Sequence, residues 1–445
     1  MNPDSNTPSA EQAPTNRRWM ILGLASSMSF FLYLHRYTWN MIRPELKKEY
    51  GFSNVELEGL FSLFNLTYAV GQIPSGIVCD LFGPHLFLVV ILVLWSVTLP
   101  LFGLTGDRNI LGSLRLLFGA AQAGCYPGLS KTTRNWFPLR TRTGVQGLVA
   151  SFAGRGGGAM ASIIMGTLLM GYCGLGWRLS LVVMMLAGLA FAAVFFFLFR
   201  NRPEDDPAVN EAECNLIHAG EESDSAGPAV LPFRRVARSV SMLVFIFQQF
   251  INAGADYVYV AILGSYFQSL GYTPKDMGLL ISMPLLGGAC GGVVGGFIND
   301  FLIRRTGSRR WSRTAVGFVG KALAAGCLLI AINQETGVAA AAWLFVVKFF
   351  GDWTQPTVWG TCTDIGGRYS ATVFSIINTA GSLGMVITPF VGGFVLDHFA
   401  TTEIINGVKT TITNYNPLFL LVVGMYLVSS VCWLFINAEK SLESE

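Results

Sequence analysis

The pentapeptide Gly76-Ile-Val-Cys-Asp80 recurs in pattern as Gly296-Phe-Ile-Asn-Asp300, 220 residues further along the chain. Each copy ends a long apolar segment, and each is followed within a few residues by another glycine, Gly83 or Gly307. A glycine lets two helices approach closely, and a carboxylate at a helix end can cap a neighbouring helix or pair with an arginine. One Gly-x-x-x-Asp pattern is a weak signal, but two at matching positions indicate a fold built from two repeated halves.

The composition places both halves in a membrane. Of the 445 residues, 52% are hydrophobic and 13% are charged, about half of the roughly 25% of charged residues in a soluble protein. Such a chain can bury its apolar residues only if lipid acts as the solvent. The composition therefore predicts an integral membrane protein in contact with the lipid bilayer. It excludes a soluble multidomain enzyme, a nucleic-acid-binding protein and a disordered scaffold.

Spanning the hydrocarbon takes about 20 mostly apolar residues per helix, and the chain contains twelve such segments. They divide six and six, which predicts an all-α fold of twelve transmembrane helices in two pseudo-symmetric six-helix bundles. The predicted segments are 19–42, 57–79, 86–105, 110–134, 144–172, 178–199, 240–267, 277–299, 313–332, 339–363, 371–398 and 416–437. The predicted parts are a tail at 1–18, a bundle at 19–199, a connector at 200–239, a bundle at 240–437 and a tail at 438–445.

The basic residues predict the orientation of the bundles. Eighteen of the 30 Lys and Arg residues lie in the tails, the connector or the even-to-odd connections, whereas seven lie on the opposite side. By the positive-inside rule, the side with 18 charges is cytoplasmic, so both termini are predicted to be cytoplasmic in a plasma (inner) membrane. Between Pro203 and Asp224 the connector has eight acids and no Lys or Arg. This charge pattern predicts a solvated segment, with a regulatory docking site as the alternative.

No part of the sequence indicates an enzyme or a cofactor. The eight cysteines include no Cys-x-x-Cys pair, and the four histidines are too dispersed for a metal cluster. The sequence contains no GxSxG, HExxH or P-loop string. We therefore expect no catalytic residues, no metal, no cofactor and no ATP-driven step.

Ionisable residues inside apolar segments are costly, so each is a candidate for function. The intramembrane cations are Arg36, Arg115, Arg155, Lys321 and Lys348. The acids at comparable depth are fewer, namely Asp256, Asp352 and, near a helix end, Asp364. An interior with more fixed cations than acids attracts anions. The balance of charges therefore predicts an anionic ligand.

Arg36 is the strongest candidate for binding that anion, because a guanidinium presents forked donors that match a carboxylate or a phosphate. Its alternative role is a buried ion pair that holds two helices together. Polar residues at helical spacing indicate faces that meet a cavity or another helix instead of lipid. Such faces occur in both halves and predict a central site between them. The residues predicted to join Arg36 there are Tyr33, Tyr68, Gln122, Trp359 and Asn378.

The sequence resembles the major facilitator superfamily, whose signature motif joins helices two and three and recurs between helices eight and nine. Within it, the chain is most similar to the anion:cation symporters, which include hexuronate, aldonate, tartrate and sialic-acid carriers. The strings that carry this resemblance are Tyr68-Ala-Val-Gly-Gln-Ile-Pro74, Arg115-Leu-Leu-Phe-Gly119, Trp136-Phe-Pro138, Asn201-Arg-Pro-Glu-Asp-Asp-Pro207 and Ile377-Asn-Thr-Ala-Gly381. The resemblance implies that Arg36 contacts a substrate carboxylate and that Tyr68 and Asn378 line the site. For Tyr68, a hydrogen bond between helices is an equal alternative.

The chain departs from these symporters at the positions that handle the coupling ion. Members of that family place an acid before the helix-one arginine and another in helix four, where this chain has His35 and Gln122. Glutamine cannot titrate, so His35 and Asp256 are the candidates for coupling to a proton or sodium ion. For Asp256, an ion pair with Arg155 or Lys348 is an equal alternative. The signature motif also carries Leu81 and His85 where basic residues are usual. Organophosphate:phosphate exchangers share the helix-four glutamine but add a helix-seven arginine, where this chain offers Asp256.

Together these features predict a secondary active transporter that moves a small organic anion, such as a sugar acid or a dicarboxylate, by alternating access. The resemblance implies a monomer. Two alternatives stay open. One is an exchanger of organophosphates for phosphate, and the other is a non-transporting solute sensor that signals through its connector.

Overall fold

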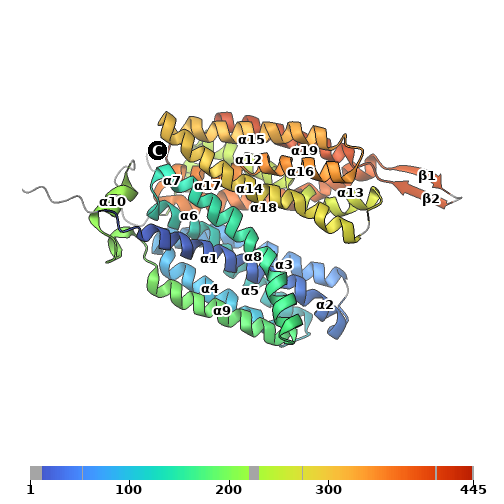
Figure 1. The fold of residues 1–445 in the computed structure, drawn as a ribbon, viewed down its shortest axis with the longest axis horizontal. Helices are drawn as coiled ribbons and strands as arrows, with labels where there is room; N and C mark the ends of the chain where they lie inside the picture. The colour runs from blue at the N-terminus through green and yellow to red at the C-terminus, as the bar shows by residue number, and fades with distance from the viewer. Residues whose placement is uncertain (1–12, 53, 220–229, 273, 406–407, 443–445) are drawn as a thin grey trace, which may run out of the picture.

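The structure is a computed structural model that describes residues 13–52, 54–219, 230–272, 274–405 and 408–442. Within these ranges the chain is mostly helical and forms an N-terminal bundle beside a C-terminal bundle (Figure 1). The bundles lie close together where α1 (Arg17–Tyr37) begins and α19 (Asn416–Phe435) ends, and they diverge toward the other end. We call these ends the tail end and the hairpin end.

The N-terminal bundle is built from helices that join end to end into longer rods. After α1 its elements are α2 (Trp39–Tyr50), α3 (Asn54–Phe82), α4 (Pro84–Leu101), α5 (Arg108–Ala123), α6 (Cys125–Trp136), α7 (Leu139–Gly147), the π-helix η1 (Leu148–Ala153), α8 (Gly154–Ala161), the π-helix η2 (Ser162–Tyr172) and α9 (Trp177–Leu198). The connector contains the 3-10 helix η3 (Pro203–Asp205), α10 (Glu211–His218) and α11 (Phe233–Arg238). Figure 1 shows α10 at the tail end, beside the start of α1.

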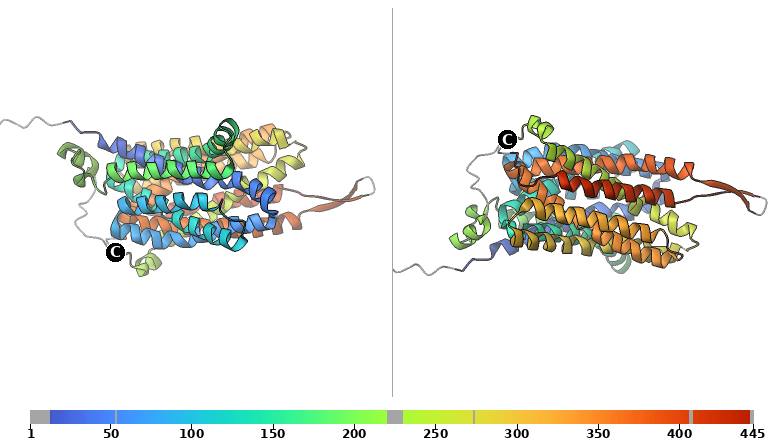
Figure 2. Two further views of the ribbon diagram at one scale, coloured as in Figure 1. Left: turned by 90° about the horizontal axis from the view of Figure 1, so that it is seen from below. Right: turned by 90° about the horizontal axis from the view of Figure 1, so that it is seen from above.

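The C-terminal bundle repeats this arrangement. Its elements are α12 (Val240–Ala255), the π-helix η4 (Val258–Ile262), α13 (Leu263–Ser269), α14 (Pro274–Thr306), α15 (Arg309–Ala331), α16 (Gly337–Gly351), α17 (Thr354–Gly366), the 3-10 helix η5 (Gly367–Tyr369), α18 (Ser370–His398) and α19. The views in Figure 2 show the rods of both bundles running roughly parallel to the long axis.

Each of the twelve predicted segments corresponds to one rod in the described part of the chain, so the twelve-helix, two-bundle fold is confirmed. Seven of the described helical stretches are long and apolar enough to cross a membrane by length and composition alone. The other rods carry charged residues or are broken near their middles. Among these rods, the predicted segment 110–134 is divided at Gly124. The segment 339–363, which lies within one of the seven apolar stretches, is also divided, after Gly351. Glycine has low helix propensity, which is a physical reason for a break at these two places.

A β-hairpin connects the last two rods and was not predicted from the sequence. Strand β1 (Thr401–Ile405) pairs antiparallel with β2 (Val408–Ile412), with Thr401 opposite Ile412. Both strands are rich in Thr, Ile and Val, whose branched side chains favour extended backbone. The hairpin projects beyond the helices at the end opposite both tails (Figure 1).

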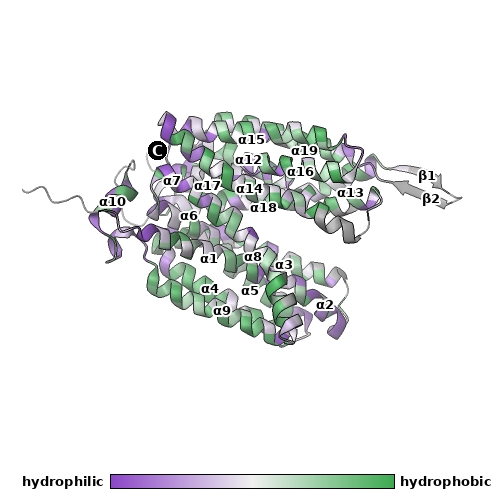
Figure 3. Cartoon of the chain, viewed as in Figure 1, coloured by the Kyte–Doolittle hydropathy of each residue, from purple (hydrophilic) through white to green (hydrophobic). Residues whose placement is uncertain are grey.

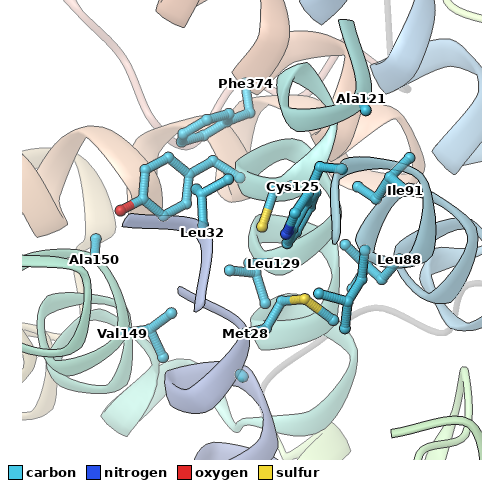
Figure 4. Packing of buried hydrophobic residues seen from close by; sticks show 14 of the residues in the cluster. Met28, Leu32, Leu88, Ile91, Ala121, Cys125, Leu129, Val149, Ala150 and Phe374 are labelled. Atoms are coloured by element: carbon cyan, nitrogen blue, oxygen red, sulfur yellow. The ribbon is translucent and has the colours of Figure 1, made fainter. Parts of the chain in front are cut away.

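Hydrophobic residues run along the rods of both bundles (Figure 3), and their side chains are found both in the interior and on the outer surface. In the N-terminal bundle Met28, Leu32, Leu88, Leu129 and Val149 are fully buried and pack together across four rods (Figure 4). By contrast, large side chains on the outer faces are exposed in the protein alone, as at the C-terminal half of α18. Such a surface is suited to contact with lipid.

The two bundles meet at the tail end through the repeated glycines. A Cβ atom added at Gly76 of α3 would lie 2.7 Å from the carbonyl oxygen of Ala371 in α18. A Cβ atom added at Gly296 of α14 would lie 2.8 Å from the carbonyl oxygen of Thr143 in α7. Real Cβ atoms do not approach backbone oxygens so closely. Each repeat thus uses its glycine to bring one helix against a helix of the other bundle.

The repeated aspartates bind backbone N–H groups of the same helices. Asp80 accepts hydrogen bonds of 3.3 and 2.8 Å from the N–H groups of Ala371 and Thr372, in the first turn of α18. Lys131 of α6 donates to the same carboxylate at 2.8 Å. Asp300 accepts hydrogen bonds of 3.1 and 2.6 Å from two N–H groups of α7. A carboxylate near the N-terminal part of a helix is favoured by the helix dipole.

The glycines that follow the motif terminate α3 and α14. Gly83 has φ 80° and Gly307 has φ 72°, a left-handed conformation that other residues rarely adopt. The two repeats therefore share both their contact with the opposite bundle and the geometry of the turn that follows.

Candidate functional site

Hydrogen bonds and ion pairs join the two bundles from the tail end to the middle of the rods. Beyond the aspartates, Asn378 Nδ2 in α18 donates to Gln72 Oε1 in α3 at 2.5 Å. Furthest from the tails, Arg155 Nη2 in α8 donates to Asp352 Oδ2 at 2.5 Å. Toward the hairpin end the two bundles diverge (Figure 1). The bundles are therefore held against each other on the tail side.

Charged side chains stay accessible where this contact ends. The side chains of Arg155 and Asp256 keep 33% and 36% of their surface exposed, although they lie halfway along membrane-spanning rods. Charged groups at this depth must face water or one another instead of lipid. We call the polar residues at this level the midplane site. It consists of Tyr33, Arg36, Tyr68, Gln122 and Arg155 from the N-terminal bundle and Asp256, Lys321, Lys348 and Asp352 from the C-terminal bundle.

Arg36 is held by neutral partners. Its Nε donates to Gln122 Oε1 at 2.9 Å. Its guanidinium carbon lies 4.4 Å from the ring centre of Tyr68 and 5.1 Å from that of Tyr33. Among the described residues, no carboxylate lies within ion-pair distance of Arg36, and its Nη2 is buried without a hydrogen-bond partner. The arginine is thus oriented by an amide and aromatic rings while its charge stays uncompensated.

The C-terminal bundle carries a balanced charge network. Lys348 Nζ donates to Asp352 Oδ1 at 2.7 Å and to Asp256 Oδ1 at 2.8 Å. Lys348 and Asp352 lie one helical turn apart in the sequence, a spacing that brings two side chains together. Lys321 is buried in the same bundle, and its Nζ lies 4.9 Å from the ring centre of Tyr426. Two lysines and two aspartates within this bundle compensate one another.

Counting both bundles, four cations face two acids at the midplane site, which leaves a formal charge of +2. The cations are Arg36, Arg155, Lys321 and Lys348, and the acids are Asp256 and Asp352. A positive site between low-dielectric walls raises the local concentration of anions. This geometry is suited to binding a small anion between the two bundles.

Four residues of the site lie at or near irregularities in the helices. Asp256 is the C-cap of α12, Asp352 is the C-cap of α16, and Gln122 lies two residues before the break at Gly124. Arg155 lies in the short helix α8, between two π-helices. Broken helices and π-turns leave backbone groups free and are frequent at functional sites in membrane proteins.

Trp359 and Asn378 lie on the tail side of the site and take part in the contact between the bundles. The buried indole of Trp359 packs edge-on against Tyr126 of the N-terminal bundle, with 5.1 Å between ring centres. Asn378 binds Gln72 as described above. In this conformation both residues border the site on its tail side. Their contact with a substrate stays a prediction.

His35 points away from Arg36. Its ring is fully buried, packs against Phe31 and accepts a hydrogen bond at Nδ1 from Trp95 Nε1 at 3.1 Å. A Cβ atom added at Gly188 of α9 would lie 2.7 Å from the ring, so the histidine faces the interior of the N-terminal bundle. Consecutive residues of a helix project about 100° apart, which explains why neighbours in sequence do not share the site. Its role in coupling stays a prediction without a contact to the midplane site.

The sequence analysis left the role of Arg155 open and did not include Lys348 or Asp352 among the predicted site residues. A signal for these residues is present in the sequence. Arg155 is an arginine without an acid partner in the first half, and Lys348 and Asp352 form a lysine–aspartate pair in the second half. Arg115, another intramembrane cation, serves packing: its Nε donates to the Leu60 carbonyl at 3.1 Å and its guanidinium lies 4.2 Å from the ring centre of Trp39. Among the described residues, no group of three or more His, Cys, Asp or Glu is placed to hold a metal ion.

Two helical bundles that meet around a positively charged site, held against each other on the tail side, define the class of alternating-access membrane transporters. The sequence profile of the Major Facilitator Superfamily matches residues 25–389. The chain belongs to the Major Facilitator Superfamily, and the resemblance found in the sequence is confirmed.

Several relatives match nearly the whole chain. The probable sulfoacetate transporter SauU of Cupriavidus necator is 29% identical over 96% of this chain and 95% of its own. The probable galactarate/D-glucarate transporter GudP of Escherichia coli is 28% identical over 91% of this chain and 92% of its own. The hexuronate transporter of Bacillus subtilis is 25% identical, covering 83% and 86% of the two chains.

Solved structures show the same fold. The crystal structure of the fucose:proton symporter FucP of Escherichia coli superposes with a TM-score of 0.68 at 16% identity, covering 94% of this chain and 99% of that chain. A second FucP structure, in the outward conformation, gives a TM-score of 0.65 at 15% identity, covering 94% and 97%. At this level of identity the likeness supports the architecture only.

Proposed function

We propose that the protein is a secondary active transporter that moves a small organic anion, a sugar acid or another small diacid, across the membrane by alternating access. The observation that carries this proposal is the uncompensated Arg36, which is held in place by Gln122, Tyr33 and Tyr68 and has an N–H group free to bind a ligand. A guanidinium with no acid partner is well suited to a carboxylate or a sulfonate.

The names of the relatives support this substrate class. Sulfoacetate, galactarate, glucarate and hexuronates are the solutes named for the proteins that match this chain. All of them are small acids, and the first three carry two acid groups. The formal charge of +2 at the midplane site is suited to such dianions.

Alternating access requires the tail-end contacts to open while the hairpin end closes. The positive-inside rule places the tail end, with its 18 basic residues, in the cytoplasm of the cell. In that orientation the structure is closed toward the cytoplasm and accessible from outside. Opening toward the cytoplasm must separate Asp80 from α18 and Asp300 from α7, which are the contacts of the repeated motif.

Coupling to a proton or sodium ion is a further part of the proposal. Asp256 is the acid best placed for it, because one of its oxygens binds Lys348 while 36% of the side chain stays exposed. His35 is enclosed within its bundle and lacks this access. We further propose that the protein acts as a monomer in the plasma (inner) membrane, with a complete site in one chain.

The proposal is tested by thermal unfolding of the purified protein with a panel of glucarate, glucuronate, gluconate, sulfoacetate, succinate and glucose 6-phosphate. A ligand that binds only the folded state stabilises it by RT ln(1 + [L]/Kd). We expect stabilisation by one of the sugar acids or diacids in the wild type and its loss in Arg36→Ala. The matched control is Arg178→Gln, which removes an arginine that pairs with Glu49 outside the site.

The panel distinguishes this substrate class from that of the organophosphate exchanger. Stabilisation by glucose 6-phosphate alone would favour an organophosphate exchanger. Stabilisation by an acid that persists unchanged in Arg36→Ala would place the binding site elsewhere and contradict the assignment of Arg36.

A further inference from the structure

Arg155 differs from the other cations of the midplane site because its partner lies in the opposite bundle. It is the residue through which α8 of the N-terminal bundle reaches Asp352 of the C-terminal bundle, at 2.5 Å. A notch in α14 provides the space for this contact. A Cβ atom added at Gly288 would lie 2.6 Å from Arg155 Nη1 and would also collide with Asp352 Oδ2. The ion pair thus fits at a position where only glycine leaves enough room.

Asp352 does not depend on Arg155 for its charge balance. Lys348 Nζ binds the other oxygen of the same carboxylate at 2.7 Å. Within the C-terminal bundle, Lys321 and Lys348 already balance Asp256 and Asp352. Breaking a buried ion pair is costly chiefly because it leaves a charge without a partner. Because Lys348 remains, Asp352 can release Arg155 at a smaller cost than an isolated pair would require.

Arg155 also has unused donor capacity. Its Nη1 is buried without a hydrogen-bond partner, and its side chain is 33% exposed. A buried donor without an acceptor is unfavourable, so an incoming acceptor gains from binding it. Arg36 presents the same feature at Nη2. Two guanidinium groups of one bundle therefore each offer an unpaired N–H group.

Tyr33 lies beside Arg36 and packs on α8, the helix that carries Arg155. The Arg36 guanidinium lies 5.1 Å from the ring centre of Tyr33. The Tyr33 ring also packs on α8, since a Cβ atom added at Gly154 would lie 3.4 Å from Tyr33 Cε2 and one at Gly158 would lie 3.7 Å from Tyr33 Cδ1. Arg155 lies between these two glycines in sequence. Tyr33 thus contacts both Arg36 and the helix that carries Arg155.

We propose that Arg155 is a second acid-binding residue, which exchanges Asp352 for the far acid group of a two-acid substrate while Arg36 holds the near one. This inference rests on the proposed function and extends it from organic anions to a selectivity for dianions. A monoacid satisfies Arg36 but leaves Arg155 on Asp352. A diacid satisfies both guanidinium groups and leaves Asp352 with Lys348. Selectivity for two acid groups then depends on Arg155 of α8, which takes no part in the tail-end motif.

The experiment compares matched acids that differ by one acid group. Glucarate and gluconate share a six-carbon chain, and sulfoacetate differs from acetate by its sulfonate. Calorimetric Kd values for each pair are measured on the purified wild type and on Arg155→Gln, Arg155→Lys and Asp352→Asn. Arg178→Gln is the matched control, because it removes an arginine on the hairpin side that binds Glu49 and Tyr50 instead of the site.

We expect the wild type to bind the diacid of at least one pair roughly tenfold or more tighter than its monoacid, as a charge-assisted hydrogen-bonded pair would give. Arg155→Gln should bring this ratio close to 1, and Arg155→Lys should give an intermediate ratio because lysine keeps the charge but loses the fork. Asp352→Asn removes the competing carboxylate and should raise the ratio several-fold. Arg178→Gln should keep the wild-type ratio.

The outcomes separate this inference from the proposed function. If acids bind in an Arg36-dependent manner but the diacid-to-monoacid ratio is the same in Arg155→Gln, the second acid-binding role is wrong and the proposed function stands. An equal loss for both acids of a pair would make Arg155 a structural residue. If the folded wild type binds no member of either pair and no acid of the wider panel, both proposals fail together. Should Arg155→Gln not fold, Arg155→Lys and Asp352→Asn provide the same test through opposite shifts of the ratio.

Discussion

The two bundles treat their intramembrane charges in opposite ways. In the N-terminal bundle Arg36 is oriented by Gln122 and aromatic rings, without an acid within ion-pair distance among the described residues. In the C-terminal bundle Lys348 lies between Asp256 and Asp352, and the cations and acids balance. An uncompensated buried charge is costly but available to a ligand, whereas a compensated one stabilises the fold and offers little net field. On this difference we propose that ligand binding falls chiefly to the first bundle and charge balance to the second.

The largest effect on stability is expected at Lys348. Lys348→Met leaves the partly exposed Asp256 without its cation and leaves Asp352 with Arg155 alone, so the free energy of unfolding should fall by about 2–3 kcal/mol. Arg36→Met orphans the Gln122 amide but also removes an uncompensated charge, so its net effect should stay within about 1 kcal/mol. Both are measured by denaturant titration in the same detergent. Adding Asp256→Asn to Lys348→Met should recover at least half of the loss, and equal destabilisation by the two single variants would remove the contrast between the bundles.

A substitution at Gln122 should give Arg36 an acid partner within its own bundle, as Lys348 has in the C-terminal bundle. Gln122→Glu places a carboxylate where the amide oxygen now lies 2.9 Å from Arg36 Nε, so Arg36 gains an internal counter-ion. Because a substrate acid must then compete with it, we expect the Kd for glucarate or sulfoacetate to rise roughly tenfold to a hundredfold, measured by calorimetry. Gln122→Leu, which loses the hydrogen bond without adding charge, should give a smaller rise. An unchanged Kd in Gln122→Glu would mean that the charge of Arg36 is not what binds the anion.

The tail-end contact is the feature that the two bundles share. Gly296→Ala introduces a Cβ atom 2.8 Å from a backbone oxygen of α7, so the tail-closed conformation should become less populated. Labelling of a single cysteine introduced at the buried Ser375, in a background without other cysteines, should then become several-fold faster. Gly393→Ala is the control, because nothing lies within 4 Å of an added Cβ there. Equal labelling rates in both variants would argue against a glycine-dependent closure.

The smallest effect is expected outside the membrane, where the connector binds the start of α1. Glu213 accepts hydrogen bonds from the N–H groups of Arg17 and Arg18 at 2.9 and 3.1 Å. Burial alone raises the pKa of Glu213. Hydrogen bonds from Thr15 and from these N–H groups together outweigh burial, so the pKa lies below its usual 4.5. A lowered pKa in the folded protein means that the ionised form stabilises the fold above about pH 4.5 and that this contribution is lost as pH falls through the folded value.

The measurement is the melting temperature of the wild type and of Glu213→Gln between pH 7 and pH 4. The wild type should be slightly more stable at pH 7, and the difference should shrink as the pH approaches 4. A difference that grows on acidification would contradict the role of the ionised carboxylate.

The sequence was sufficient to predict the features that repeat or follow a regular period. The twelve segments, the two halves and the tail-end motif follow from hydropathy and from the 220-residue repeat. Arg36 stands out because a cation in an apolar segment requires a reason. The pairing of Lys348 with Asp352 follows from their spacing of one helical turn.

The features that could not be predicted depend on how the bundles dock. Arg155 and Asp352 are 197 residues apart, and Gln72 and Asn378 are 306 apart, so no local pattern indicates either contact. The breaks at Gly124 and after Gly351 depend on tertiary packing, because many other glycines lie within unbroken helices. The direction of His35 could have been predicted, since a residue adjacent to Arg36 on a helix cannot share its face.

The most direct test of the central claim is flux through proteoliposomes. Purified wild type, Arg36→Ala and Arg178→Gln are reconstituted at equal density, loaded with unlabelled glucarate or sulfoacetate, and supplied with the same labelled acid outside. We predict counterflow in the wild type and in Arg178→Gln, with a loss of roughly a hundredfold in Arg36→Ala because the acid loses its charge-assisted partner. Counterflow at the wild-type rate in Arg36→Ala would contradict an anion site centred on Arg36.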